Sequence, residues 1–164
     1  MAKRMLIVTD LRVESLNTLR LALEHAGEEQ VEIVLMYAET SPDSITEMLF
    51  HNPEYRIKEL VKPEFQEALA ILKNRYENVI RSLRIRLFSG FTTNAFRNFA
   101  EGLRIEVVYL PRTYQLQPGE RGFDPTPYIK KSGLPYHELD YTPGANSVKD
   151  NVLDSLFKLD TVRA

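Results

Sequence analysis

A strand, a helix and a second strand follow one another within the first 38 residues, and this order constrains the fold more than any other feature. Residues 5–8 are a short apolar run of the length of a buried strand, and residues 31–36 are another. Between them, apolar residues recur at three- and four-residue steps over residues 16–26, and Gly27 can close that helix in the left-handed conformation. So short a connection predicts a parallel strand–helix–strand unit with a right-handed crossover.

The same alternation continues along the chain. Further helices are predicted from a start at residues 41–44, over residues 65–80, 95–100 and 128–132, and over residues 148–159; further strands are predicted over residues 83–87, 105–110 and 136–141. The first, second and fourth strands are almost continuously apolar, as strands buried on both faces are, whereas the third and fifth alternate. This pattern predicts an α/β fold, a three-layer sandwich around a five-stranded parallel sheet in the order 3-2-1-4-5.

Composition and charge exclude several classes of protein. The 164 residues contain no cysteine, which excludes a disulfide scaffold, a thiolate zinc site and a cysteine nucleophile. Lysine and arginine (21) nearly balance aspartate and glutamate (23), so no basic field recruits nucleic acid. No apolar run approaches the ~20 residues of a membrane span, and the first run is too short for a signal peptide. We therefore expect a cytoplasmic protein that binds neither nucleic acid nor a membrane.

Asp10 is the sharpest candidate for a binding residue. It follows the first strand, and the carboxyl ends of strands one and four border the topological switch point, where such folds bind ligands. A carboxylate there can orient a ribose or a metal-bound phosphate. Alternatively, Asp10 caps the first helix or pairs with a charge at its start.

A loop rich in proline and glycine, residues 111–125, reaches the same end of the sheet. Structureless stretches beyond ~12–15 residues in a compact domain are usually functional or disordered. Gly119 and Gly122 would let backbone amides approach a phosphate, and Arg112 and Arg121 would supply bidentate donors. The prolines lack N–H donors and favour a solvated surface loop instead, so both interpretations are retained.

The sequence predicts neither a catalytic residue nor a metal site. His25, His51 and His137 are far apart and form no H-x-H or H-E-x-x-H pattern, so each is expected at the surface. The nucleophile elbow G-x-S-x-G, the Walker A motif and the Rossmann G-x-G-x-x-G are absent. The chain is therefore not expected to be an enzyme.

Three segments resemble the universal stress protein family. Residues 5–15, an apolar strand followed by Thr-Asp and a serine near the helix start, resemble the opening of these proteins, and residues 31–38 resemble their second strand. Residues 90–109 are similar to their third helix and fourth strand, with Gly90 and Ala100 at the family's spacing. The resemblance implies the adenine nucleotide alpha hydrolase-like sandwich and a homodimer paired through the fifth strands.

The ATP-binding signature of that family is not matched. Members that bind ATP carry G-x2-G-x9-G-[S/T] directly after the fourth strand, where this chain has Leu-Pro-Arg at residues 110–112. Gly119 and Gly122 have the spacing of the first two glycines but come too late in the chain. Asp10 matches a nucleotide-contacting position, and Ala38 would offer the main-chain contact to adenine. The resemblance thus implies a divergent member that does not bind ATP in the usual manner.

Residues 1–142 are expected to form the universal-stress-protein-like domain, and residues 143–164 a C-terminal helical extension whose apolar stripe covers the dimer mate. The leading interpretation is a non-enzymatic regulatory or interaction protein without a cofactor, homodimeric through the fifth strand, the C-terminal helix or both. A further, unidentified protein partner stays open.

Two alternatives remain. One is a stress protein that binds ATP or AMP through a divergent phosphate loop, and the other is an enzyme of the wider nucleotide-hydrolase-like fold. The residues of such a nucleotide crevice would be Asp10, Ala38, Arg112, Gly119, Arg121 and Gly122.

Overall fold

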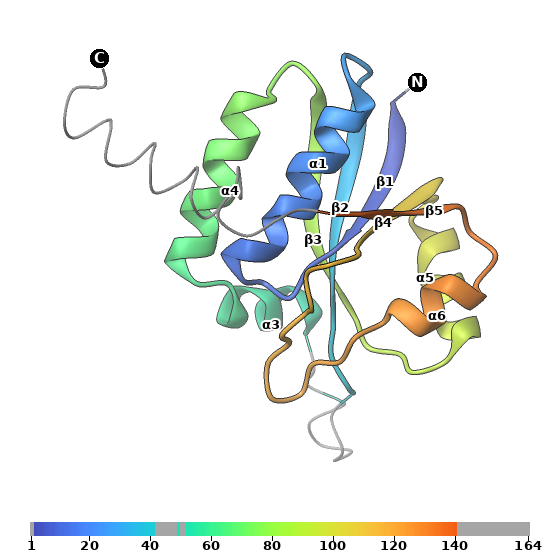
Figure 1. Ribbon diagram of the computed structural model, residues 1–164. Coiled ribbons are helices and arrows are strands. Elements are labelled where there is room, and N and C mark those ends of the chain that lie inside the picture. The colour runs from blue at the N-terminus through green and yellow to red at the C-terminus, as the bar shows by residue number, and fades with distance from the viewer. Residues whose placement is uncertain (1, 42–48, 50–51, 141–164) are drawn as a thin grey trace.

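The computed structural model describes residues 2–41, 49 and 52–140, which fold around one five-stranded parallel sheet (Figure 1). The strand order is β3-β2-β1-β4-β5, with helices on both faces. The predicted three-layer α/β fold and the predicted strand order are therefore both confirmed.

The elements alternate along the chain as the sequence pattern predicts. The strands are β1 (Lys3–Val8), β2 (Val31–Ala38), β3 (Ile80–Phe88), β4 (Val107–Pro111) and β5 (Tyr136–Leu139). The helices are η1 (Val13–Ser15, a 3-10 turn), α1 (Leu16–Ala26), α3 (Pro53–Leu60), α4 (Pro63–Arg75), α5 (Thr93–Gly102) and α6 (Thr126–Lys131).

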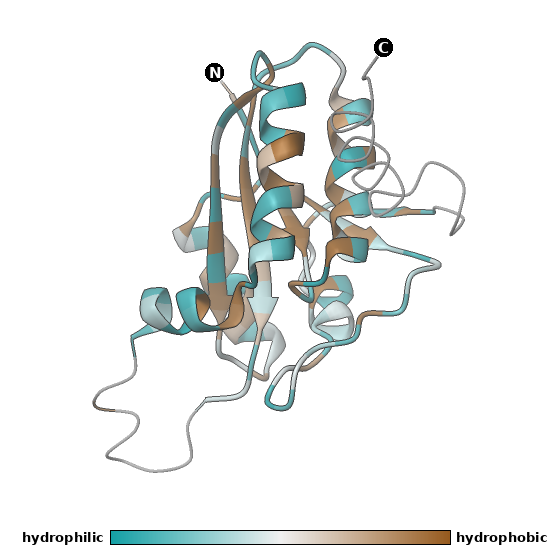
Figure 2. Cartoon of the chain, turned by 90° about the vertical axis from the view of Figure 1, so that its left-hand side faces the viewer, coloured by the Kyte–Doolittle hydropathy of each residue, from teal (hydrophilic) through white to brown (hydrophobic). Residues whose placement is uncertain are grey.

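The hydrophobic core lies on both faces of the sheet. Side chains alternate along a strand, so Met5 and Ile7 of β1 face the layer that holds α1, α3 and α4, while Leu6 and Val8 face α5 and α6. The largest buried side chains include Phe65 on the first side and Phe96 on the second. Figure 2 shows the apolar residues concentrated along the strands, between the two helical layers. Burial on both faces explains why β1 reads as a continuous apolar run.

Local signals set where several helices begin and end. Gly27 ends α1 with a φ of +67°, a backbone conformation that favours glycine, as predicted. Thr92 caps α5, because its hydroxyl oxygen accepts a hydrogen bond from the Ala95 N–H at 3.0 Å. Asn52 caps α3 in the same way ahead of a proline at the first helical position. Capping side chains thus fix the entry points of the helices that follow β2 and β3.

One predicted element is shorter than its sequence pattern. The apolar stripe over residues 65–80 predicts one long helix, yet α4 ends at Arg75 and Ile80 already begins β3. The Val79 N–H donates to the Tyr76 carbonyl in a turn that reverses the chain toward the sheet. The prediction of a helix to residue 80 was wrong, because the last apolar residues of the stripe belong to this turn and to the edge strand.

Two other predicted elements lie outside the described residues. They are the helix predicted from a start at residues 41–44, of which residues 42–48 are not described, and the C-terminal helix within residues 143–164. Within the ranges that the structure describes, no helix is long and apolar enough to cross a membrane.

Candidate functional site

The candidate site lies where β1, β2 and β4 end, and the loop of residues 112–125 lies against this edge of the sheet (Figure 1). The loop connects β4 to α6. Its contacts with the strand ends decide what the site can bind.

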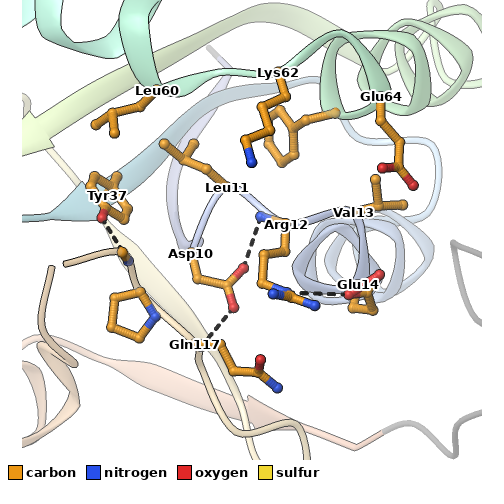
Figure 3. A pocket seen from close by; sticks show the side chains of 13 residues that line it. Asp10, Leu11, Arg12, Val13, Glu14, Tyr37, Leu60, Lys62, Glu64 and Gln117 are labelled. Atoms are coloured by element: carbon orange, nitrogen blue, oxygen red, sulfur yellow. Dashed lines mark hydrogen bonds and ion pairs between the residues drawn. The ribbon is translucent and has the colours of Figure 1, made fainter.

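Asp10 holds the loop through its side chain. The carboxylate oxygen Oδ2 accepts a hydrogen bond from the Gln117 N–H at 2.8 Å and another from the Tyr114 hydroxyl at 2.5 Å. The other oxygen, Oδ1, accepts the Arg12 N–H at 3.0 Å and so stabilises the turn between β1 and η1 (Figure 3). Hydrogen bonds to an ionised carboxylate are about twice as strong as neutral ones, and Asp10 is only 5% exposed. Asp10 is therefore a structural anchor for the loop and for the turn.

Tyr37, at the end of β2, is the second anchor of the loop. Its hydroxyl oxygen accepts a hydrogen bond from the Gly119 N–H at 3.1 Å, as Figure 3 shows. A Cβ added to Gly122 would lie 2.5 Å from that hydroxyl and 2.5 Å from Pro118, closer than real Cβ atoms approach. The loop therefore needs a glycine at this position to pack on Tyr37. Burial raises the pKa of the Tyr37 hydroxyl above its usual value.

The loop also bonds to the main chain that follows β2. The Ala38 carbonyl accepts the Phe123 N–H at 3.1 Å, and the Thr40 N–H donates to the Arg121 carbonyl at 2.8 Å. Residues 39 and 122 form an antiparallel bridge between these two contacts. The Ala38 carbonyl, one of the main-chain groups that an adenine could use, is therefore already bonded to the protein's own loop.

A buried ion pair ties α3 to the same edge. Glu39 is 1% exposed, and both of its carboxylate oxygens accept hydrogen bonds from the Arg56 guanidinium at 2.5–3.0 Å. This bidentate geometry matches the planar fork of an arginine. Neither residue was predicted from the sequence. An acid directly after a strand was the available signal, but its partner on a later helix has no fixed spacing.

A cavity of about 490 Å³ remains between the β1–η1 turn and the start of α4 (Figure 3). Leu60 and Phe65 contribute apolar walls, and Asp10 and Tyr37 border it beside the loop. Lys62 extends its ammonium group into this space (Figure 3), and it forms no ion pair within the described ranges. The cavity thus combines an apolar wall with one unpaired positive charge.

The structure separates the six predicted nucleotide-crevice residues into three locations. Asp10 and Gly119 line the cavity, whereas Ala38 and Gly122 serve the contact between loop and strand. Arg121 donates from Nη2 to the Thr40 carbonyl at 3.2 Å and does not line the cavity.

Arg112 lies elsewhere, beside β5. Its side chain is 65% exposed and lies 3.7 Å from the Asp140 carboxylate. The two arginines therefore do not converge on the end of β1, as a phosphate cradle would require.

Comparisons with known proteins show which solved structures have a similar fold. No family model and no curated protein matches the chain. Among solved structures, the hypothetical protein PH0823 is similar with a TM-score of 0.54 and 17% identity, over 88% of this chain and 100% of that one. Hypothetical protein MJ0577 has a TM-score of 0.52 and 17% sequence identity, and the match covers 88% of this chain and 99% of that one. A universal stress protein family member from Burkholderia pseudomallei has a TM-score of 0.49 and 11% sequence identity, and the match covers 84% of this chain and 95% of that one.

The chain shares its fold with PH0823 and MJ0577, and the predicted adenine nucleotide alpha hydrolase-like α/β fold is confirmed. Two less similar structures are a universal stress protein in complex with cAMP and an Arabidopsis thaliana family protein with AMP bound, with TM-scores of 0.44 and 0.46.

Proposed function

We propose that the chain is a non-enzymatic regulatory or interaction protein with the universal stress protein fold, and that it does not bind ATP in the usual manner of that family. The observation that carries this proposal is the loop of residues 112–125, which is bonded to the ends of β1 and β2. The groups that a nucleotide would need there are engaged by the chain itself.

The hydrogen bonds of the loop explain why a nucleotide is disfavoured. A ribose hydroxyl that bonds to Asp10 would compete with the Gln117 N–H and the Tyr114 hydroxyl. An adenine amino group at the Ala38 carbonyl would displace the Phe123 N–H. Each displaced donor loses its protein partner, and such hydrogen bonds contribute about 0.5–1.5 kcal/mol to a neutral acceptor and about 1.5–3 kcal/mol to a charged one. ATP binding in the usual manner of the family therefore requires the loop of residues 112–125 to detach from the ends of β1 and β2.

The direct test is to look for nucleotide carried by the protein. Freshly purified protein is denatured, and the supernatant is analysed by ion-pair chromatography; calorimetric titrations with Mg–ATP, AMP and cAMP follow. We expect no nucleotide in the supernatant and no saturable heat. Near-stoichiometric nucleotide, or saturable binding of Mg–ATP, would overturn the proposal.

Adenine-nucleotide binding in the 490 Å³ cavity is the second candidate. It is supported by the apolar wall of Leu60 and Phe65 and by the unpaired ammonium group of Lys62, which together suit a flat ring and an anionic group. If AMP binds there, Lys62→Ala should weaken it at least tenfold. Lys58→Ala, on α3 and outside the cavity lining, should leave AMP binding unchanged. Equal affinities for both variants would eliminate this candidate.

The assembly proposed for this protein is a homodimer. Its support is the edge strand β5, whose residues 136–138 are exposed and which pairs with β4 alone within the described residues. The apolar stripe in the sequence of residues 143–164 is the second proposed contact, and the double substitution Leu153→Asp and Leu156→Asp tests it by light scattering. A monomeric mass for the unmodified chain refutes the dimer. A dimeric mass for the double variant refutes the C-terminal contribution and leaves β5.

A further inference from the structure

Two histidines that are far apart in the sequence meet on one side of the molecule. His25 lies in the last turn of α1, and His137 lies in the middle of β5. Their ring centroids are 5.6 Å apart, with the ring planes tilted by 44°. Both side chains are exposed to solvent. The two histidines lie close together because β5 pairs in parallel with β4 and α1 packs across both strands.

Tyr109 of β4 is a rigid platform for both rings. It is 2% exposed, and the ring of His137 stacks on it at a centroid distance of 5.4 Å and an interplanar angle of 28°. His25 contacts the same ring edge-on at 6.2 Å. Within the part of the chain that the structure describes, neither imidazole has a hydrogen bond or an ion pair. The rings are therefore held by packing, while their nitrogens are left available.

The spacing of the two rings suits a shared metal ion. Two imidazoles on one tetrahedral zinc, each with a Zn–N bond of about 2.0–2.1 Å, place their ring centroids roughly 5 Å apart. The observed centroid distance is 5.6 Å, and a small rotation of either side chain would bring the two rings to the distance that a shared zinc requires. Imidazole nitrogen suits zinc, copper and nickel, whereas magnesium and calcium prefer oxygen ligands.

The surroundings favour a cation. His25 stands at the C-terminal end of α1, where the helix dipole presents its negative end. Glu29 lies close enough to Tyr109 for its charge to contribute to a raised pKa of that hydroxyl, after the larger effect of burial. A carboxylate is therefore near the platform on which the histidines rest.

We propose that His25 and His137 form a two-histidine site for a divalent transition metal, zinc, copper or nickel, that links α1 to the edge strand β5. The described residues contain no cluster of three or more histidine, aspartate or glutamate side chains arranged for a metal, so water completes the coordination. The ion joins the short strand β5 to a helix that is itself packed in the core. This site does not depend on the loop of residues 112–125, although His137 lies on β5, the strand through which the homodimer is proposed.

The test is calorimetric titration of the full chain with ZnCl₂ at pH 7.5. We expect one saturable site, and at least tenfold weaker binding in each of the variants His25→Ala and His137→Ala. His51→Ala removes the third histidine of the chain and is the matched control; it should bind zinc as the unmodified protein does. Far-UV circular dichroism without metal verifies that each variant is folded.

Two further measurements separate this site from incidental binding. One equivalent of Cu²⁺ should show two imidazole nitrogens by pulsed electron paramagnetic resonance, and one in either single variant. Zinc should slow amide hydrogen exchange in β5 of the unmodified protein, because an ion that binds only the native arrangement opposes its opening. Unchanged zinc affinity in the His25→Ala, His137→Ala double variant, or the loss of binding in His51→Ala, would overturn the proposal.

Discussion

Asp10→Asn tests whether the carboxylate holds the loop of residues 112–125 closed. The asparagine oxygen can still accept the Arg12 N–H, but its amide group then faces the Gln117 N–H, which is also a donor. The Tyr114 hydroxyl can rotate to accept from the amide, so that bond is weakened and retained. A hydrogen bond to a charged group contributes ~1.5–3 kcal/mol, so the loss of one and the weakening of another costs about 2–3 kcal/mol.

Hydrogen exchange measures this cost at the loop itself. If the opening free energy of the loop falls by about 2–3 kcal/mol, and 1.4 kcal/mol is a factor of ten, the Gln117 amide should exchange roughly 30- to 140-fold faster. Asp140→Asn is the matched control, because Asp140 is 54% exposed and its ion pair with Arg112 spans 3.7 Å. Such surface pairs contribute ~0–1 kcal/mol. Unchanged exchange at Gln117 in Asp10→Asn, or an equal change in Asp140→Asn, would refute the anchoring role.

Three further predictions concern the same edge of the sheet. Gly122→Ala should lower the free energy of unfolding by about 1–3 kcal/mol in urea, because its Cβ overpacks the Tyr37 hydroxyl, whereas Gly102→Ala, whose Cβ meets nothing within 4 Å, should be neutral or stabilising. Glu39→Gln should cost about 3 kcal/mol by the same assay, because it leaves the Arg56 guanidinium without its buried counter-charge; a cost under 1 kcal/mol contradicts this. Because the pKa of Tyr37 is raised in the folded state, the folded protein holds the proton of the Tyr37 hydroxyl more tightly than the unfolded chain does. The contribution of the protonated hydroxyl to the free energy of unfolding is therefore complete below the ordinary pKa of 10.0 and is lost as pH rises through the raised pKa. Denaturation at pH 9 and pH 11 should show a smaller alkaline loss in Tyr37→Phe than in the unmodified protein, and an equal loss counts against the assignment.

The fold could be predicted because its signals are local. The apolar runs of β1, β2 and β4 and the alternation of β3 and β5 reflect how many faces of each strand are covered, and this fixed the strand order. The cap at Thr92 and the turn at Gly27 are likewise set by a few neighbouring residues. The end of α4 could not be placed, because the hydrophobic period continues across the turn at Tyr76 into β3.

The candidate site was predictable only in part, because its contacts are long-range. The position of Asp10 after β1 pointed to the correct edge of the sheet, but its partner Tyr114 lies 104 positions away. Glycine spacing suggested a phosphate cradle, whereas the structure uses Gly122 for a close approach to Tyr37. No local pattern distinguishes a glycine that admits a ligand from one that admits the chain's own side chain.

The tethering of the loop at both of its ends has a consequence for competition at the carboxyl edge of the sheet. A segment that is covalently attached to its own binding site acts at an effective concentration of about millimolar for a short connection. A free metabolite that needs Asp10 or the Ala38 carbonyl must therefore compete with an occupant that dilution never removes. Proteins that need a ligand to complete their fold become less stable as that ligand is depleted. Here the chain carries the occupant within itself, so the integrity of this edge should be the same in a starved cell and in a well-fed one.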